Sequence, residues 1–447
     1  MPDTPISGAR RHPAGTAPGG PAAEPEAATP REAEAATARD GEAATAPADG
    51  PRLLGWSRGD TVRTVLALTL AGALLTGAWI IHRADGFGAT ASFSLLAGAA
   101  LGILFERGRF CFYCIFRDLF EKGDSRGAYS VLAALATGTV GYVLVFTIRQ
   151  ADPATGRLPT AAHIAPVSVA LVVAGLAFGI GIVLSGGCIA GHLYRLGEGS
   201  LRALPGLAGV LGGFGAGFLT WNPLHDTFIR GAPVPWLPAT FGYAGALLLQ
   251  LAVLAALGVL LLRWNPPQPA RAPLRVDRTE IRRALFFRRW PALLTGGLVG
   301  LVGFLAYLRV EPLGVTSQLS GLTRTAMDSG GLLPGTLQGL DTSLAGCVAL
   351  VVETVTDNGW LIIGIVAGSL AAALPGRRVT LEPVTVRNGA TALLGGVLLG
   401  WGAVIGLGCT VGVLLSGTQA LALSGWVFAA AVLSGLALGF RAGLHRS

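Results

Sequence analysis

The stretch Gly-Cys-Ile-Ala-Gly-His-Leu-Tyr-Arg-Leu-Gly-Glu-Gly at residues 187–199 follows a long apolar run, and the chain contains a partial copy of it. The stretch Gly-Cys-Thr-Val-Gly at 408–412 follows another apolar run in the other half of the chain. Both read Gly-Cys-x-x-Gly, and a further glycine, Gly181 or Gly402, lies seven residues before each cysteine. Cysteine occurs only five times in 447 residues, so its repeated placement in one glycine pattern indicates a shared role.

A single motif of this kind would be explained by packing. Glycine lets membrane helices approach each other closely, and a buried cysteine behaves as a small hydrophobic residue. The repetition instead favours a thiol-lined site inside the membrane, where two repeats meet. This hypothesis places the following residues at the site: Gly187, Cys188, Gly191, Gly408, Cys409 and Gly412.

The composition is that of a membrane protein. Hydrophobic residues make up 52% of the chain, charged residues only 13%, and the mean hydropathy is +0.60, which excludes an ordinary soluble domain. The net charge of +8 comes largely from arginines in short loops, so it reflects membrane topology and not nucleic-acid binding. We expect free thiols, no cofactor and, since the chain has no Gly-x4-Gly-Lys-Ser/Thr motif, no ATPase activity.

Ten apolar runs are long enough to cross a bilayer, whose hydrocarbon core needs about 20 helical residues. The sequence therefore predicts an all-α polytopic membrane protein with membrane lipid around it. Many glycines also favour short re-entrant helices. The predicted spans are Thr64–Ile81, Ala89–Phe105, Ala128–Ile148, Pro166–Ser185, Leu204–Trp221, Leu237–Leu262, Pro291–Leu308, Asn358–Leu374, Gly389–Gly408 and Ala422–Phe440.

Arginines alternate from loop to loop along these spans. Loops rich in arginine lie on the cytoplasmic side, and this rule places both termini in the cytoplasm of a cell whose plasma (inner) membrane holds the protein. The spans that end at Cys188 and Cys409 then run in opposite directions, so we expect an inverted pseudo-symmetric repeat with its site near the midplane.

The same topology predicts the domain organisation. Residues 1–55 have almost no large apolar side chains, so we expect a disordered tail there. The other expected segments are an additional N-terminal transmembrane helix at 56–88, a first half-repeat at 89–236, a linking helix with an arginine-rich loop at 237–290, and a second half-repeat at 291–440 with an extracytoplasmic segment at 311–357.

Three further cysteines lie outside the paired motifs. Cys111 and Cys114 form a Cys-x-x-Cys pair, which can bind zinc or do dithiol chemistry. Two further zinc ligands are lacking, and the simpler interpretation is an interfacial helix, with Cys111 more suited than Cys114 to face the same pathway as Cys188. We interpret Cys347 as a structural cysteine because it has no twin.

Two charged residues follow the first motif. Arg195 and Glu198 lie just beyond the end of the apolar run. They could pair with each other and fix a turn, or Arg195 could attract an anion to the cytoplasmic mouth. We interpret His192 as a packing residue.

Together these motifs resemble the YeeE/YedE sulfur-transport family. The resemblance rests on the 187–199 stretch, on Arg-Phe-Cys at 109–111, and on Gly-Cys-Thr-Val-Gly with a later Ser-Gly-Trp-Val within 408–427. It covers roughly residues 89–440. It implies an hourglass-like helical fold in the inner membrane that takes up thiosulfate, with three cysteines contacting the anion in turn. By motif match these are Cys111, Cys188 and Cys409.

The resemblance leaves the substrate and mechanism open. This chain is longer than the thiosulfate-transporting members, and longer members are linked to selenium metabolism, so a selenium compound is an alternative substrate. A second alternative is a sulfur relay, in which a cysteine hands sulfane sulfur to a small, TusA-like cytoplasmic sulfur carrier. We expect transport and not enzyme catalysis, because the sequence places no evident buried His, Asp or Glu beside Cys188 to act as a general base.

Overall fold

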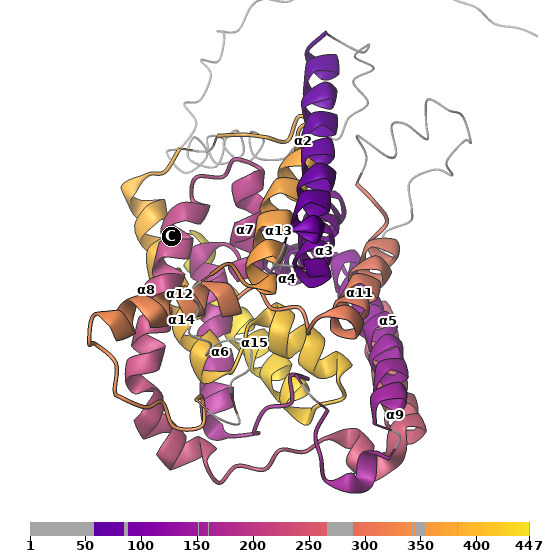
Figure 1. The fold of residues 1–447 in the computed structure, drawn as a ribbon, viewed down its shortest axis with the longest axis vertical. Coiled ribbons are helices and arrows are strands. Elements are labelled where there is room, and N and C mark those ends of the chain that lie inside the picture. Colours follow the sequence, from indigo (N-terminus) through magenta and orange to yellow (C-terminus); the bar gives the residue numbers. More distant parts are fainter. Residues whose placement is uncertain are drawn as a thin grey trace, which may run out of the picture. The chain divides into compact units, whose positions relative to one another are not determined.

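The computed structural model of the protein consists of helices joined by loops (Figure 1). The described residues are 58–446, apart from 85–87, 151, 160, 266–288, 342–343, 345–353 and 382. Within these ranges no β-strand occurs, and only an isolated bridge joins Trp236 to Ala422. The helices of the first half are α2 (Arg58–Arg83), α3 (Gly88–Gly108), α4 (Phe112–Lys122), α5 (Arg126–Arg149), η1 (Pro153–Thr155), α6 (Val169–Ser185), α7 (Ile189–Gly197), α8 (Ala203–Leu224), η2 (His225–Ile229) and α9 (Leu237–Trp264).

The second half repeats this order of long and short helices. Its short helices, α12 and η3, follow α11 and α14, just as α4 and α7 follow α3 and α6. The helices are α11 (Ala292–Arg309), α12 (Ser317–Ser329), α13 (Asp357–Ala373), α14 (Val386–Ile405), η3 (Thr410–Gly417), α15 (Leu423–Arg441) and η4 (Leu444–Arg446).

The prediction of an all-α polytopic membrane protein is confirmed. Nine helices in the described part are long and apolar enough to cross a membrane. The eighth predicted span coincides with α13, which has 17 residues and is also apolar. Boundaries differ by a few residues: α3 continues to Gly108, past the predicted end at Phe105. The predicted tail at 1–55, most of the arginine-rich loop and Cys347 lie outside the described residues.

Corresponding helices of the two halves make corresponding contacts. Helix α3 packs on α13, and α11, which occupies α3's place in the second half, packs on α5. In the same way α6 packs on α15 and α14 packs on α8. Helices α6 and α14, the two that precede the Gly-Cys-x-x-Gly motifs, pack directly on each other. Gly181 near the end of α6 faces Gly395 of α14, whereas Gly402 near the end of α14 faces Ala174 of α6. The two helices are therefore antiparallel, and the motifs meet through the segments that follow them, where Cys188 faces Thr410.

Glycines make these helix contacts close. A side chain at Gly98 of α3 would overlap the backbone carbonyl of Leu361 on α13. The glycines seven residues before each motif cysteine do the same between α6 and α14. A Cβ at Gly181 would lie 2.8 Å from the carbonyl oxygen of Gly395, and a Cβ at Gly402 would lie 2.7 Å from that of Ala174. Their shared spacing from the cysteines thus reflects reciprocal packing of α6 on α14.

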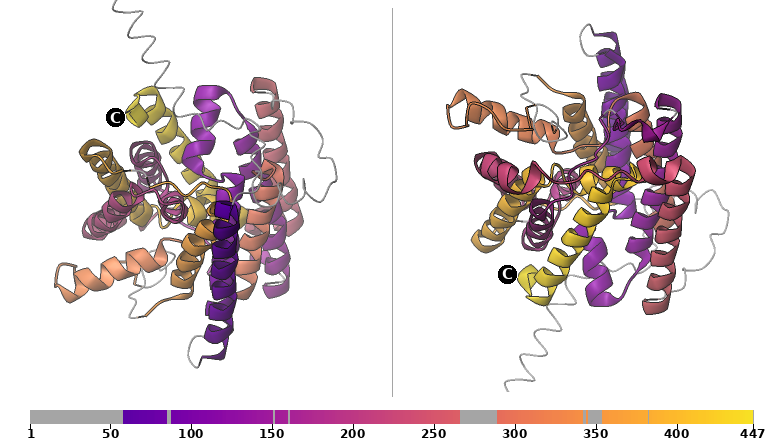
Figure 2. Two further views of the ribbon diagram at one scale, coloured as in Figure 1. Left: turned by 90° about the horizontal axis from the view of Figure 1, so that it is seen from above. Right: turned by 90° about the horizontal axis from the view of Figure 1, so that it is seen from below.

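Helices α2 and α9 lie outside this paired arrangement. Helix α2 packs on α3 and α13, and α9 packs mainly on α5 at the edge of the bundle (Figure 2). Both expose large apolar side chains along much of their length, such as Leu75 and Leu248. Such surfaces suit a helix that faces lipid. That the first and sixth spans are additions to a repeated core stays a prediction.

Candidate functional site

Three cysteines and one threonine occupy equivalent positions at the starts of four short helices. Cys111, Cys188 and Cys409 directly precede α4, α7 and η3, and Thr316 directly precedes α12. All four are buried, with at most 2% of each residue exposed. The first backbone N–H groups of a helix lack partners within it and favour negative charge. The arrangement therefore places S–H and O–H groups beside N–H groups in a buried region.

The turn between α6 and α7 holds Cys188. Gly186 ends α6 in the left-handed conformation, at φ 80°, which glycine adopts without the steric cost of a Cβ. The Ser185 hydroxyl then donates to the carbonyl of Gly187 at 2.8 Å. Cys188 Sγ accepts from the backbone N–H of Gly191 at 3.3 Å. The last glycine of the motif thus supplies a donor to the motif's own cysteine.

Gly191 also separates two thiols. A Cβ at this position would lie 3.4 Å from Cys188 Sγ and 3.5 Å from Cys111 Sγ. Both sulfurs therefore border the small space that the absent side chain leaves. The two cysteines of the Cys-x-x-Cys pair therefore differ in position, because Cys111 borders this space and Cys114 does not.

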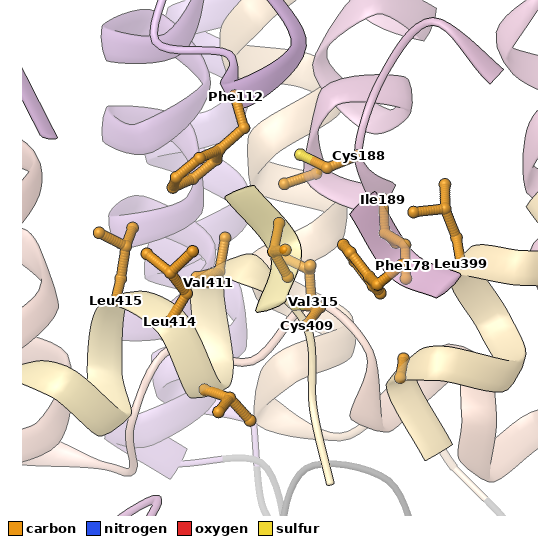
Figure 3. Packing of buried hydrophobic residues seen from close by; sticks show 14 of the residues in the cluster. Phe112, Phe178, Cys188, Ile189, Val315, Leu399, Cys409, Val411, Leu414 and Leu415 are labelled. Atoms are coloured by element: carbon orange, nitrogen blue, oxygen red, sulfur yellow. The ribbon is translucent and has the colours of Figure 1, made fainter. Parts of the chain in front are cut away.

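The second motif meets the first at Thr410. The Cys188 thiol faces the Thr410 hydroxyl, which is buried and makes no conventional hydrogen bond within the described structure. Cys409 Sγ faces the Thr316 hydroxyl and the N–H groups of Val411 and Gly412, although, unlike Cys188, it accepts no capping hydrogen bond from the helix that follows. Cys188 and Cys409 belong to one buried cluster, with Val315 beside Cys409 (Figure 3).

The backbone around Cys409 differs from that around Cys188. Gly408 has a φ of 149°, a conformation that side chains rarely tolerate. The segment after Cys409 forms a π-helix, whereas the segment after Cys188 is an α-helix. The sequence likeness of the two motifs therefore does not extend to the same helix type.

Arg195 contacts the Cys-x-x-Cys pair instead of Glu198. Its Nη2 lies 3.0 Å from Cys114 Sγ and 3.9 Å from Cys111 Sγ. Its Nη1 donates to the carbonyl of Gly186 at 2.5 Å. Among the described residues no ion pair joins Arg195 to Glu198, so the interpretation that these two pair with each other is wrong. The guanidinium instead connects the two thiols to the turn that precedes Cys188.

A pocket of about 260 Å³ lies beside Cys114. Glu106 within it is ion-paired with Arg378 at 2.6 Å. Burial and the nearby charge of Glu106 raise the pKa of Glu198 to about 7, so near neutral pH this carboxyl group is partly protonated and the pocket is positive overall. The charged lining residues are Glu106, Arg109, Arg195, Glu198, Arg289 and Arg378.

A second pocket, of about 470 Å³, lies at the other ends of α3 and α13. It is lined by Thr90 at the start of α3 and by Glu311 and Asp357, while the arginine-lined pocket includes residues at the end of α3. Helix α3 has 21 residues, which corresponds to about 30 Å at 1.5 Å per residue. The buried thiols lie on segments between two polar pockets that are about one membrane thickness apart.

The predicted site residues fall into two groups. The structure brings Cys111, Cys188, Gly191 and Cys409 into one buried region, and it places Arg195 and Glu198 at the arginine-lined pocket. The His192 ring is buried against Gly206 and also lies beside Gly187, and its Nε2 has no hydrogen-bond partner within the described structure. A buried histidine thus lies next to the residue before Cys188, which the sequence did not make evident.

Sequence reasoning missed the two hydroxyl groups of Thr316 and Thr410. Thr410 is adjacent to Cys409 inside the motif, which was an available signal. Thr316 is in no motif, and only the position of α12 relative to α4 reveals it.

Buried polar groups and two polar pockets in a multi-pass helical protein suit the passage of a solute across the membrane. The sequence profile described as sulphur transport matches residues 107–438, so the protein is a membrane transport protein and not an enzyme. The chain belongs to this family, known also as YeeE/YedE.

Similar proteins in other organisms carry transporter names. The thiosulfate transporter TsuA of Escherichia coli (strain K12) is 30% identical over 339 residues, which are 74% of this chain and 89% of the relative. The thiosulfate transporter TsuA of Spirochaeta thermophila is 29% identical over 367 residues, covering 74% and 93%. The probable transporter YedE of Escherichia coli (strain K12) is 32% identical over 177 residues, covering 38% and 40%.

Proposed function

We propose that this protein takes up thiosulfate or a related sulfur-containing anion through a constriction lined by Cys111, Cys188 and Cys409. One observation carries the proposal: these three thiols each begin a short helix in one buried region between two polar pockets. The names of the two TsuA relatives support the choice of thiosulfate.

Neutral thiols suit the passage of a dianion. Two unit charges 4 Å apart interact with about 4 kcal/mol at an effective dielectric constant of 20, so a thiolate in the constriction would repel thiosulfate strongly. A neutral S–H group is a weak donor. It can replace part of the anion's hydration shell without holding the ion, as passage through a pore requires.

Hydroxyl and backbone donors extend the row of thiols. The buried Thr410 hydroxyl faces the Cys188 thiol and has no conventional hydrogen-bond partner in the described structure, so turning its proton toward an anion gives up no more than a weak contact with sulfur. Leaving such a group without a partner costs about 1–3 kcal/mol. A passing anion at this point would offset that cost.

The proposal includes an orientation and an internal symmetry. We place the arginine-lined pocket and both termini in the cytoplasm of a cell with this protein in its inner membrane, following the positive-inside rule. Residues 89–236 and 291–440 form inverted half-repeats in this proposal, supported by the matching helix order and contacts. The segments 56–88 and 237–290 add a peripheral helix and a linker.

Substitution of Cys188 in proteoliposomes tests the function. Uptake of labelled thiosulfate, with sulfate and selenite as competitors, should require the wild-type chain and favour thiosulfate; a preference for selenite would establish the selenium alternative. Cys188→Ala should reduce uptake severely, and Cys188→Ser should retain a part because a hydroxyl group also donates. Cys347→Ala is the matched cysteine control and should transport normally.

The sulfur relay makes a different prediction. It requires sulfane sulfur bound covalently to Cys188 during turnover, ready for a small, TusA-like carrier. Mass spectrometry of the Cys188 peptide after turnover should find the unmodified thiol. Finding a persulfide there would replace the transport mechanism with the relay.

A further inference from the structure

The Cys111–Cys114 pair is a second chemical feature that anion passage does not explain. Cys111 caps α4 and Cys114 lies in its first turn, and the two thiols face each other. Two cysteines spaced Cys-x-x-Cys at a helix N-terminus are the arrangement that dithiol oxidoreductases use to form and break a disulfide. Both thiols are free in the structure.

The two thiols differ in their access to solutes. Cys114 lines the arginine-lined pocket, whereas Cys111 does not line it and is 1% exposed. Arg195 Nη2 lies closer to Cys114 Sγ than to Cys111 Sγ, at 3.0 Å against 3.9 Å. A positive charge beside a thiol favours the thiolate, the form that attacks disulfides. Cys114 is therefore placed to react first, and Cys111 to resolve.

We propose that Cys111 and Cys114 form a reversible intramolecular disulfide that switches anion passage off. The oxidant is a low-molecular-weight organic disulfide that enters the arginine-lined pocket. The Cys114 thiolate attacks one of its sulfurs, which forms a mixed disulfide and releases one thiol. Cys111 then attacks Cys114 Sγ and releases the second thiol. The two cysteine thiols are oxidised, the organic disulfide is reduced to two thiols, and the two protons end on those thiols.

Two contacts link this reaction to the proposed pathway. Cys111 Sγ borders the space at Gly191 that Cys188 Sγ also borders, so oxidation removes one S–H donor from the row. Arg195 connects the dithiol to the carbonyl of Gly186, and a neutral disulfide is a poorer partner for a guanidinium than a thiol that can ionise. Oxidation thus weakens the contact that ties α4 to the turn before Cys188.

Mass spectrometry can observe the disulfide independently of transport. Trypsin cleaves after Arg109 and Arg117, so the peptide 110–117 contains both cysteines and no other. In the full-length protein in liposomes, an alkylating reagent should label this peptide twice after treatment with dithiothreitol and not at all after treatment with glutathione disulfide. Double labelling after oxidation would overturn the proposal.

Uptake measurements test the switch, which depends on the proposed function. Oxidised wild-type protein should lose at least about tenfold of its uptake, because one donor to the anion is lost, and dithiothreitol should restore it. Cys114→Ser should transport when reduced and should not respond to glutathione disulfide. A response by this variant, or oxidised wild-type protein that transports normally, would exclude the switch. If reduced wild-type protein fails to take up thiosulfate, the proposed function fails, while the peptide labelling still decides on the disulfide.

Discussion

Gly191→Ala separates the role of the motif glycine in transport from its role in folding. The added methyl group would lie 3.4 Å from Cys188 Sγ and 3.5 Å from Cys111 Sγ, which are ordinary van der Waals distances. No backbone atom is closer, so the protein should fold. Alanine is favoured over glycine in a helix by up to about 1 kcal/mol, so the variant should be at least as stable as the wild type.

Uptake should nevertheless fall sharply. The methyl group fills the space that both sulfurs border, so an anion there could no longer contact the two thiols together. A hydrogen bond to a charged group contributes about 1.5–3 kcal/mol, and 1.4 kcal/mol corresponds to a factor of ten, so uptake should fall at least about tenfold. The assay is labelled-thiosulfate uptake in proteoliposomes, alongside a thermal unfolding measurement on the same preparation.

Gly212→Ala is the matched control for this variant. Gly212 lies within α8, and a Cβ there would meet nothing within 4 Å. It makes the same change of residue type in a helix, so stability should not fall and uptake should stay normal. If Gly191→Ala transports as well as Gly212→Ala, the space between the two sulfurs is not on the anion's path and the reasoning is refuted.

Three further predictions concern the pocket, the hydroxyl and the helix contacts. Burial and Glu106 raise the pKa of Glu198 to about 7, so uptake should fall as the pH rises from about 6 to 8 and this carboxyl becomes charged. Glu198→Gln should flatten the pH profile of uptake, and an unchanged profile would show that another group causes the pH dependence. Thr410→Val removes a buried hydroxyl without a conventional partner, so stability should hold or rise by about 1 kcal/mol while uptake falls several-fold; lost folding would contradict this. Gly98→Ala forces a methyl group onto the carbonyl of Leu361, so it should destabilise the protein by more than about 3 kcal/mol. Size-exclusion chromatography should then show a loss of monodisperse protein, whereas normal yield and stability would count against the close helix contact.

Hydropathy was sufficient to locate the membrane helices. A run of about 20 apolar residues can hardly do anything but cross a bilayer, so all ten predicted spans coincide with helices of the structure. The sequence did not predict which helices pack on each other. Glycine spacing indicates that a helix packs closely, but it does not identify the neighbouring helix. That α3 packs on α13, more than 250 residues away in sequence, required the structure.

The candidate site was predicted in part for a similar reason. Cysteine is rare in this chain, so the repeated motif around Cys188 and Cys409 was enough to predict a shared site. The partner of Arg195 could not be predicted from the sequence. Its guanidinium contacts α4, which is distant in sequence, instead of the nearby Glu198. Threonine is common and ambiguous in sequence, so Thr316 and Thr410 gained meaning only when their hydroxyl groups were found facing thiols.

The glycine contacts between long helices restrict how this transporter can move. In the α3–α13 pair, Gly98 on one helix and Gly364 on the other each admit a carbonyl group of the partner. Gly102 and Gly368 repeat this arrangement one turn further along, so a slide of less than one turn would drive the carbonyl groups into the larger side chains between the glycines. The long helices therefore form a rigid frame that resists rocking between inward-open and outward-open states. We therefore expect any gating motion to involve the four short helices, which Cys111, Cys188, Cys409 and Thr316 directly precede.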